Sequence, residues 1–408
     1  MVFAGLFSAL VKQEAAAAPS WQLDTSISND NQAISNGNIM QTDVSDDGNY
    51  FIVMDRDVNN TSAIDDVKVF ERSNNSWTQK GPTVNVHVDV INWTYSYFSA
   101  QINNTGDTFA VAFDELSGSA AAGYVHVYEY NSSTSSWVAK GNHGTAANPE
   151  YSDIYPPSGA VTRDWGNCMQ LSGDGNRVVC RGNLSNSAVD TYYMFDWNSS
   201  TNSWDRVIHY LNGTPYDYMI YDDNGTARKF NFSLIYMHKD GDMIFGTWTP
   251  QQNSARVLTW DAVNLNWSLM GGNLHHSSFS SSGSQGRISK NKLVVTLTNG
   301  YQTNTAYQYN PRIYEWNATT SSWDERGTNG FTGIPYNRQA NWLISHIGAL
   351  PNTDGTRVVY SNKIYTLSNN TWSEESSTPN SLYVAHYNEN VLVLVDESNR
   401  SFEMYAYR

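Results

Sequence analysis

The chain repeats one pattern of hydrophobic and polar positions along most of its length. A short hydrophobic segment is followed by a polar turn and then by a second hydrophobic segment. Most of the turns contain Asp and Gly, which tolerate positive φ, so this pattern is a strong hairpin signal. Hairpins are therefore predicted at Ser45–Gly48, Asn104–Asp107, Ser172–Gly175, His238–Gly241 and Asn352–Gly355, with degenerate versions at 290–292 and 388–390.

A third segment follows each hairpin, and in several repeats it alternates between apolar and polar residues. Val67–Glu71, Val125–Tyr130 and Ile313–Trp316 show this period of two, which is typical of half-buried strands. A short polar turn then leads to a fourth segment, which carries a tryptophan preceded by Ser, Asn or Thr. Each repeat therefore predicts four antiparallel strands.

The tryptophan of the fourth strand recurs at intervals of 49 to 67 residues. The residues in this position are Trp21, Trp77, Trp137, Trp204, Trp267, Trp323 and Trp372. Four-stranded repeats of this length in an array of four to eight indicate a β-propeller, in which each repeat forms one blade. Because seven tryptophans match seven turns, the sequence predicts an all-β, seven-bladed propeller, with these tryptophans as structural residues.

The last repeat contains only three strands before the chain ends. The segment 20–26 supplies the missing fourth strand, so we expect the ring to close by pairing the amino-terminal strand with the carboxyl-terminal blade. Closure removes the open edges that a linear array would leave. We expect an arm at 1–19 and a single propeller over 21–408, with blades at about 39–81, 97–141, 167–209, 229–272, 283–327, 343–375 and 381–408.

The repeat resembles known propeller families. The segment Trp165–Val179 is similar to the "FG…LS-x-DG-x" repeats of FG-GAP-like and WD40-like propellers, and the Val-x-Val-Tyr-Glu…Ser-Trp half is similar to their outer strands. The resemblance is architectural and covers nearly all of 21–408. It implies a mostly non-enzymatic fold that binds proteins, glycans or ions through its loops. The chain departs from WD40 repeats in lacking regular Trp-Asp endings, and from kelch repeats in having a double glycine only once.

Composition narrows the choice of partners. Lys and Arg total 24 against 39 Asp and Glu, which gives a formal net charge of −15. Binding to a nucleic-acid backbone requires a basic patch, so we expect no nucleic-acid partner. Aromatic residues make up 13% of the chain, which is ample material for a packed core.

The amino end is apolar over Met1–Val11, which is too short to span a bilayer. Two interpretations stay open. One is a cleaved signal peptide, although no Lys or Arg precedes the apolar run. The other is a retained arm that docks on a partner or a membrane surface.

Cys168 and Cys180 flank the hairpin of the third repeat. A three-residue loop would place Cys168 opposite Cys180 and permit a disulfide bond, subject to its distance limits. A two-residue turn would instead place Cys168 opposite Arg181. The alternative to a disulfide is a pair of buried thiols.

The best candidates for a ligand site lie in the long connections that follow the fourth strands. Long loops in a compact domain usually carry function, and aromatic rings beside polar tips suit a sugar or a peptide. The candidates are Trp93, Tyr95, Tyr151, Asp153, Tyr155, Tyr216, Asp217, Tyr218, Tyr221, Asp222 and Trp342. The alternative is that these aromatic residues only pack the loops onto the ring.

No metal or cofactor is expected. The acidic turns at Asp46–Gly48 and Asp240–Asp242 leave calcium open, but neither has the full ligand series of a calcium loop. The chain also lacks a nucleophile elbow, a P-loop and a Rossmann fingerprint.

These features favour a non-enzymatic interaction module that binds protein or glycan through its long connections, as a structural component of a cell surface or a virion. Many Asn-x-Ser/Thr sequons, such as Asn131 and Asn317, would carry glycans if the chain is secreted. One alternative is a carbohydrate-active enzyme, a glycosidase or lyase, with its site at the propeller axis and Asp153, Asp217 or Asp222 as acids. Another is an intracellular scaffold with reduced cysteines.

Overall fold

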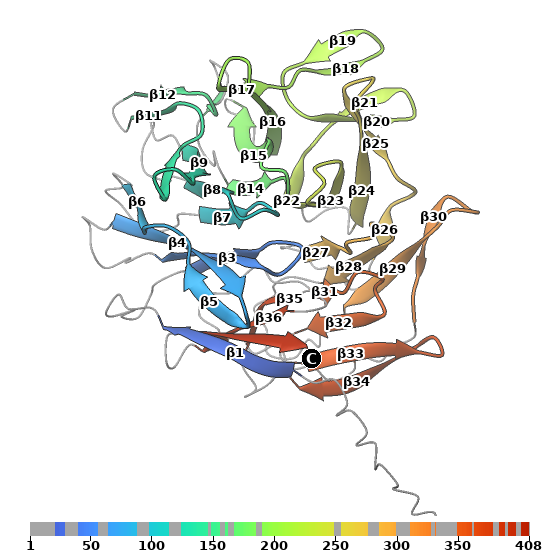
Figure 1. Cartoon of the computed structure of the whole chain (residues 1–408). Coiled ribbons are helices and arrows are strands. Elements are labelled where there is room, and N and C mark those ends of the chain that lie inside the picture. The colour runs from blue at the N-terminus through green and yellow to red at the C-terminus, as the bar shows by residue number, and fades with distance from the viewer. Residues whose placement is uncertain are drawn as a thin grey trace, which may run out of the picture.

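Seven inner strands surround a common axis, and each contacts the next in a closed cycle. The computed structural model shows seven four-stranded antiparallel sheets in a ring, as the repeat predicts (Figure 1). The structure describes residues 21–28, 40–55, 64–87, 98–113, 124–145, 148–155, 160–161, 167–184, 190–248, 254–275, 285–298, 311–327, 331, 349–360, 363–377, 383–387, 391–396 and 401–407. Within these residues there is no helix, and so none that could cross a membrane.

The two strands nearest the axis form the hairpin of each blade. The innermost strands, from blade one to blade seven, are β2 (Met40–Val44), β7 (Phe98–Ile102), β14 (Asn167–Leu171), β22 (Phe232–Met237), β27 (Gln285–Ile288), β31 (Leu350–Pro351) and β35 (Tyr383–Tyr387). Their partners are β3 (Tyr50–Asp55), β8 (Thr108–Phe113), β15 (Arg177–Leu184), β23 (Met243–Trp248), β28 (Val294–Thr298), β32 (Arg357–Tyr360) and β36 (Val391–Asp396).

Two further strands complete each blade toward the rim of the ring. The third strands are β4 (Ile64–Ser73), β9 (Tyr124–Asn131), β16 (Asp190–Asn198), β24 (Ser254–Asp261), β29 (Arg312–Asn317), β33 (Lys363–Ser368) and β37 (Ser401–Tyr407). The outer strands are β5 (Ser76–Gln79), β10 (Ser136–Ala139), β17 (Ser203–Arg206), β25 (Asn266–Leu269), β30 (Ser322–Glu325), β34 (Thr371–Ser377) and β1 (Trp21–Ser28).

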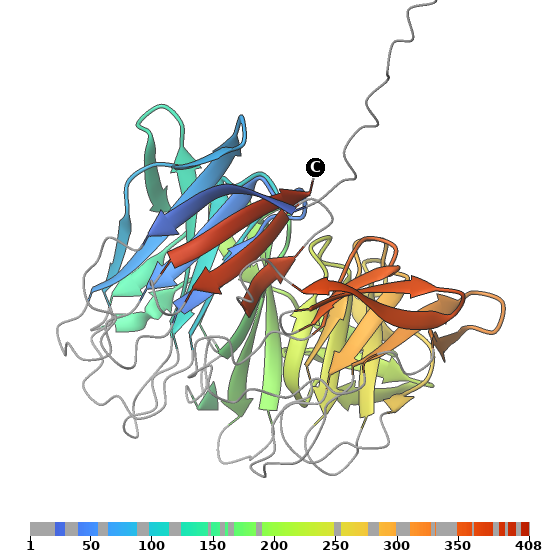
Figure 2. The same ribbon diagram turned by 90° about the horizontal axis from the view of Figure 1, so that it is seen from below.

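The ring closes through β1, as predicted. β1 pairs antiparallel with β37, so the amino-terminal strand completes the sheet of the last three strands, and Figure 2 shows it (blue) beside them (red). The Asp24 carboxylate on β1 also meets the Arg72 guanidinium on β4 at 2.7 Å. Because β4 belongs to blade one, this ion pair joins the closing strand to the next blade.

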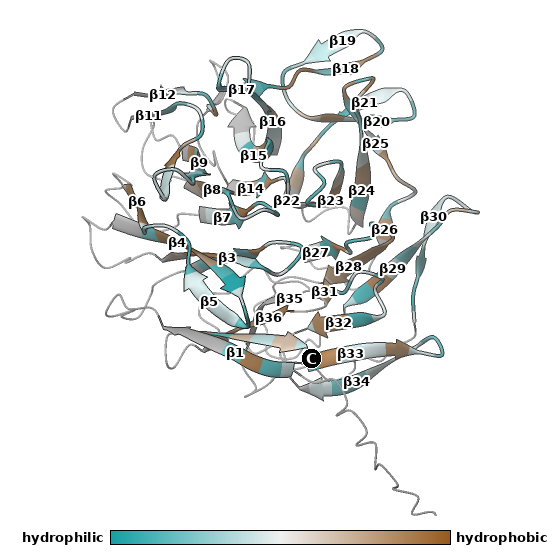
Figure 3. Cartoon of the chain, in the orientation of Figure 1, coloured by the Kyte–Doolittle hydropathy of each residue, from teal (hydrophilic) through white to brown (hydrophobic). Residues whose placement is uncertain are grey.

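The hydrophobic core lies between neighbouring blades. Seven buried clusters occupy the seven junctions; for example, Ile52 and Val69 of blade one pack with Phe109 and Val111 of blade two. In Figure 3 the strand β28 inside the ring is mostly brown (hydrophobic), whereas the outer strand β5 is pale to teal. A blade therefore buries both of its faces only when it has a neighbour on each side.

The hairpin turns use one polar arrangement in most blades. In blade one the Ser45 hydroxyl donates to Asp47 and accepts the Tyr50 amide at 3.0 Å, and Ser172 plays the same role in blade three. In blade two Asn103 takes this position, so the turn spans Asn103–Gly106, one residue earlier than predicted. Lys292 replaces the turn glycine in blade five and adopts its positive φ of 62°.

The repeating tryptophans join one blade to the next. At four junctions the indole Nε1–H donates to the carbonyl that ends the outer strand of the preceding blade, at 2.8 to 3.0 Å. The pairs are Trp137 with Lys80, Trp204 with Lys140, Trp323 with Met270 and Trp372 with Arg326. A positive-φ glycine follows each accepting residue and lies against the same indole ring.

Additional strands and hairpins extend blades one to four. β6 (Val84–His87), β13 (Ala160–Val161) and β26 (Leu274–His275) pair with β4, β15 and β24. The hairpins are β11 (His143–Thr145) with β12 (Asn148–Ser152), β18 (His209–Leu211) with β19 (Thr214–Tyr216), and β20 (Ile220–Asp223) with β21 (Thr226–Lys229). β20 also pairs in parallel with β25, so the connection between blades three and four folds along an outer strand.

Cys168 and Cys180 are separate thiols, and the disulfide permitted by the first predicted register does not form. The strands pair Gln170 with Val179 and Asn167 with Arg181, with a register shift between these pairs. The shift places Cys168 in a bulge at a φ of 55°, while Cys180 is buried between blades two and three. Burial raises the pKa of the Cys180 thiol well above its usual value.

We expect the two thiols to react differently with an alkylating agent. Cys168 is half-buried, whereas Cys180 is buried and has a raised pKa, which keeps it a thiol and slows its reaction. Peptide mapping should find Cys168 modified first in the native protein and Cys180 modified only after unfolding. An intact mass that rises on reduction would contradict this expectation, because it would reveal a disulfide.

Substitution of Gly141 tests the contact between tryptophan and glycine. Gly141 has a φ of 86°, and an added Cβ would lie 2.7 Å from the Asp153 carboxylate and 2.8 Å from the Trp204 ring. We expect Gly141→Ala to cost about 1–2 kcal/mol for the left-handed backbone and a further ~1–3 kcal/mol for overpacking. The measurement is the free energy of unfolding in urea.

Gly213→Ala is the matched control. Gly213 has a similar φ of 80°, but an added Cβ would meet nothing within 4 Å, so this variant should lose only the backbone contribution. Equal losses in the two variants would show that neither the Trp204 ring nor the Asp153 carboxylate constrains Gly141.

Candidate functional site

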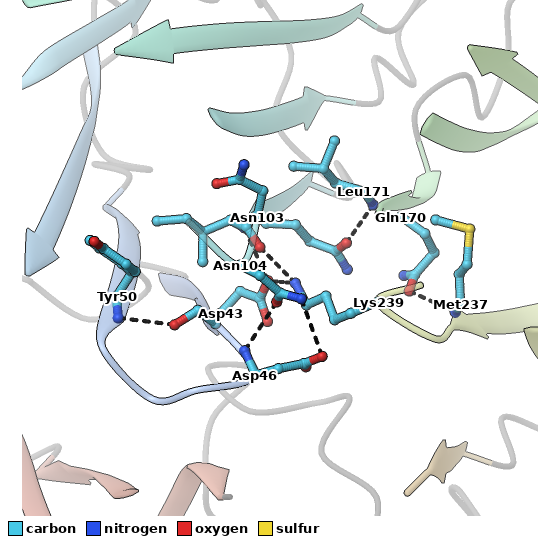
Figure 4. A network of polar contacts seen from close by, with 12 residues as sticks. Asp43, Asp46, Tyr50, Asn103, Asn104, Gln170, Leu171, Met237 and Lys239 are labelled. Atoms are coloured by element: carbon cyan, nitrogen blue, oxygen red, sulfur yellow. Dashed lines mark hydrogen bonds and ion pairs between the residues drawn. The ribbon is translucent and has the colours of Figure 1, made fainter. Parts of the chain in front are cut away.

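Polar side chains on the innermost strands connect successive blades around the axis. In blades one to three, a side-chain oxygen accepts the backbone amide of the next innermost strand (Figure 4). The side chain of Asp43 accepts the Ile102 amide at 3.0 Å, that of Gln101 accepts the Leu171 amide at 2.6 Å, and that of Gln170 accepts the Met237 amide at 3.0 Å. These bonds satisfy amides that would otherwise lie unpaired in the middle of the ring.

A buried ion pair crosses the axis below the turns. The Lys239 ammonium is 2.6 Å from the Asp43 carboxylate and donates to the Ile102 carbonyl at 2.7 Å. Lys239 is 6% exposed. Removing one partner of such a pair leaves the other charge buried without compensation, which lowers the free energy of unfolding by about 3–5 kcal/mol. Asp43 and Lys239 therefore hold blades one, two and four together.

A pocket of about 290 Å³ opens next to this pair, at the turns between the two inner strands. We call it the axial pocket. Its lining residues come from blades one, two, four and five: Asp46, Asp47, Asn104, His238, Asp240 and Lys290. All six have polar or charged side chains, so the pocket suits a polar ligand.

The acidic groups of the axial pocket differ in their existing partners. Asp47 accepts hydrogen bonds from Ser45 and Asn49 of its own turn. The Asp46 carboxylate has a weaker partner, because the side-chain amide of Asn104 donates to it at 3.4 Å. Of these two carboxylates, Asp46 is therefore the one whose oxygens are more available to a ligand.

Among the described residues, Asp240 belongs to the one group of three acidic or histidine side chains that lie close enough together to hold a metal ion. His238, Asp240 and Asp242 place their ligand atoms within 4.8 Å of one another. However, the Lys292 ammonium lies 2.6 Å from Asp240 and 2.7 Å from Asp242. A lysine charge therefore already compensates these carboxylates, and the arrangement does not favour the calcium alternative.

His238 presents a hydrogen-bond donor to the axial pocket. Its Nδ1 accepts the Asp240 amide at 3.1 Å, and burial lowers the imidazole pKa below its usual value. The ring is therefore neutral near pH 7. A neutral imidazole with an accepting Nδ1 carries its proton on Nε2.

Several predicted ligand residues fall outside what the structure describes. Trp93, Tyr95 and Trp342 are outside the described residues, and Tyr151 is described only in its backbone, on β12. Tyr155 is half-buried. Asp153 is half-buried too, and its carboxylate accepts the Asn142 amide at 2.9 Å and the Trp204 amide at 3.3 Å. The described contacts thus give Asp153 a structural role.

The prediction for Tyr221 is wrong. Its side chain is 0% exposed, contacts the rings of Phe230 and Phe232, and hydrogen-bonds to Arg256. The reason is the parallel pairing of β20 with β25, which turns Tyr221 into the core. Its neighbour Asp222 is half-buried and accepts the Gly225 amide at 2.6 Å, which stabilises the β20–β21 turn.

Three of the predicted residues do come together at the surface. The rings of Tyr216 and Tyr218 meet edge to face at 5.9 Å, and Asp217 between them is exposed. The Lys229 ammonium lies 4.7 Å from the Tyr218 ring. Burial, Tyr216 and Asp217 together raise the pKa of Tyr218. We call Tyr216, Asp217 and Tyr218 the tyrosine cluster.

Sequence reasoning missed the axial pocket because it interpreted the hairpin turns only as turns. The signal was the second position of each turn, where the residue varies between blades: Asp46, Asn104, Gly173, Lys239, Lys290 and Thr353. Three of these six residues carry a charge, which the formation of a turn does not require.

Comparison with known proteins gives a likeness of fold. No protein-family model matches the chain, and no curated protein matches it. Among solved structures, it is similar to TolB from Acinetobacter baumannii at 10% identity and a TM-score of 0.39, covering 89% of this chain and 65% of TolB. The chain thus spans less than two thirds of the length of TolB.

Two other similar structures are covered almost completely. The β-propeller domain of the Trilobed protease from Pyrococcus furiosus shares 9% identity at a TM-score of 0.45, covering 91% of this chain and 95% of the domain. An oligogalacturonate lyase in complex with manganese shares 8% identity at a TM-score of 0.48, covering 95% of this chain and 96% of the lyase. Likeness of this degree concerns architecture alone.

Proposed function

We propose that the chain is a non-enzymatic interaction module that binds a protein or glycan through the tyrosine cluster. A β-propeller supports such a module because its rigid ring carries loops that vary independently of the core. The observation that carries the proposal is the pair of half-exposed rings, Tyr216 and Tyr218, on either side of the exposed Asp217. Rings supply contact area and polar tips fix orientation.

The hydrogen bonding of the other acids supports binding rather than catalysis. The carbohydrate-active alternative relied on Asp153, Asp217 and Asp222, and the carboxylates of Asp153 and Asp222 accept backbone amides. Glycoside hydrolysis generally requires two carboxyl groups on either side of the scissile bond. Asp217 remains available, and one carboxylate beside two tyrosines suits recognition. The cell-surface or virion location stays a prediction.

The test combines binding and turnover on one panel of glycans and surface proteins. We expect the full chain to bind a subset without converting it, and Tyr216→Ala with Tyr218→Ala to weaken that binding at least about tenfold, since buried aromatic contacts dominate such interfaces. Val263→Ser is the control, because Val263 is 90% exposed on the β24–β25 turn. Cleavage of any panel member would contradict the non-enzymatic proposal. Full binding by the double variant would place the ligand elsewhere.

A further inference from the structure

The axial pocket has the features of a second binding site, separate from the tyrosine cluster. It is an open pocket, and its volume of about 290 Å³ would hold roughly ten water molecules. Four blades contribute to it, and the Asp43–Lys239 ion pair fixes blades one and four beneath it. Its lining is therefore held by the ring itself rather than by a loose loop.

Charge at the axial pocket favours a cationic ligand. The pocket and the adjoining group contain four carboxylates, Asp46, Asp47, Asp240 and Asp242, against the two ammonium groups of Lys290 and Lys292. Lys292 is already shared by Asp240 and Asp242, and Lys290 reaches only the Asp46 carbonyl, at 3.5 Å. An ammonium group beside the Asp46 carboxylate would compensate half of this excess of two negative charges.

The pocket also presents hydrogen-bond donors to a ligand. His238 lines the pocket, and because its Nδ1 accepts the Asp240 backbone amide, the neutral ring carries its proton on Nε2. Lys290 adds a second donor. Donors of the protein pair with acceptors of the ligand, so a ligand that carries only cationic donors would leave these two groups unmatched. A ligand that carries carboxylates of its own would be repelled by the acidic lining.

We propose that the axial pocket binds a small hydroxylated amine of monosaccharide size, an amino sugar in its chemistry. Its ammonium group lies against Asp46, and its hydroxyl groups accept from His238 Nε2–H and Lys290 while donating to Asp240. The inference does not rest on the tyrosine cluster, which belongs to the connection between blades three and four rather than to the turns at the axis.

The test is calorimetric titration of the full chain with glucosamine, glucose, N-acetylglucosamine and calcium chloride. Glucosamine should bind saturably. Glucose and N-acetylglucosamine, which lack the charge, should bind at least about tenfold more weakly, as expected for the loss of a charge-assisted hydrogen bond. Equal binding of glucose, no saturable binding of glucosamine, or displacement of glucosamine by calcium would overturn the proposal.

Variants separate this site from a general effect of charge. Asp46→Asn keeps the size of the side chain and should weaken glucosamine binding about tenfold or more, with the melting temperature unchanged. Asp205→Asn removes the same charge on the outer strand β17 and should have no effect. Tyr216→Ala with Tyr218→Ala should also leave glucosamine binding intact. A loss with either of these two controls would overturn the assignment to the axial pocket.

Discussion

Four of the seven junctions in the ring depend on the contact between the tryptophan of one outer strand and the residues that follow the outer strand before it. At four junctions the indole fills the space beside a positive-φ glycine and donates to the preceding carbonyl. The contact fixes the distance between blades at the rim, and the inter-blade hydrophobic clusters fill the space inside. Because each blade is completed by its neighbours, the ring must close, which β1 and the Asp24–Arg72 ion pair accomplish.

Most of this architecture follows from the sequence because its determinants are local. The hairpin turns, five of which contain Asp and Gly, mark the inner hairpins, and the recurring tryptophans mark the outer strands. Seven turns and seven tryptophans give the number of blades. The burial of Tyr221 could not be predicted from the sequence, because it depends on a parallel pairing between β20 and β25 that no local pattern encodes. The pairing register at Cys168 could not be predicted either, because a bulge rather than the length of the turn decides it.

The axial pocket shows why the candidate site was harder to predict than the fold. Its residues come from four turns that are far apart in the sequence, and each turn taken alone predicts only a hairpin. Only the ring brings Asp46, His238 and Lys290 to one opening. The same turns thus serve two purposes: their hydrogen bonds form the hairpins, and some of the same side chains, such as Asp47 and His238, line the pocket.

The most direct test compares Trp204→Phe with Trp267→Phe. Trp204 donates to the Lys140 carbonyl at 2.9 Å, whereas among the described residues nothing accepts the Nε1–H of the buried Trp267. The two variants lose similar ring volume, so the difference in their free energies of unfolding reports the hydrogen bond between blades together with the relief of the unpaired Trp267 donor. We expect Trp204→Phe to be less stable by about 1–2 kcal/mol. An equal or larger loss in Trp267→Phe would contradict the claim that this bond holds the ring together.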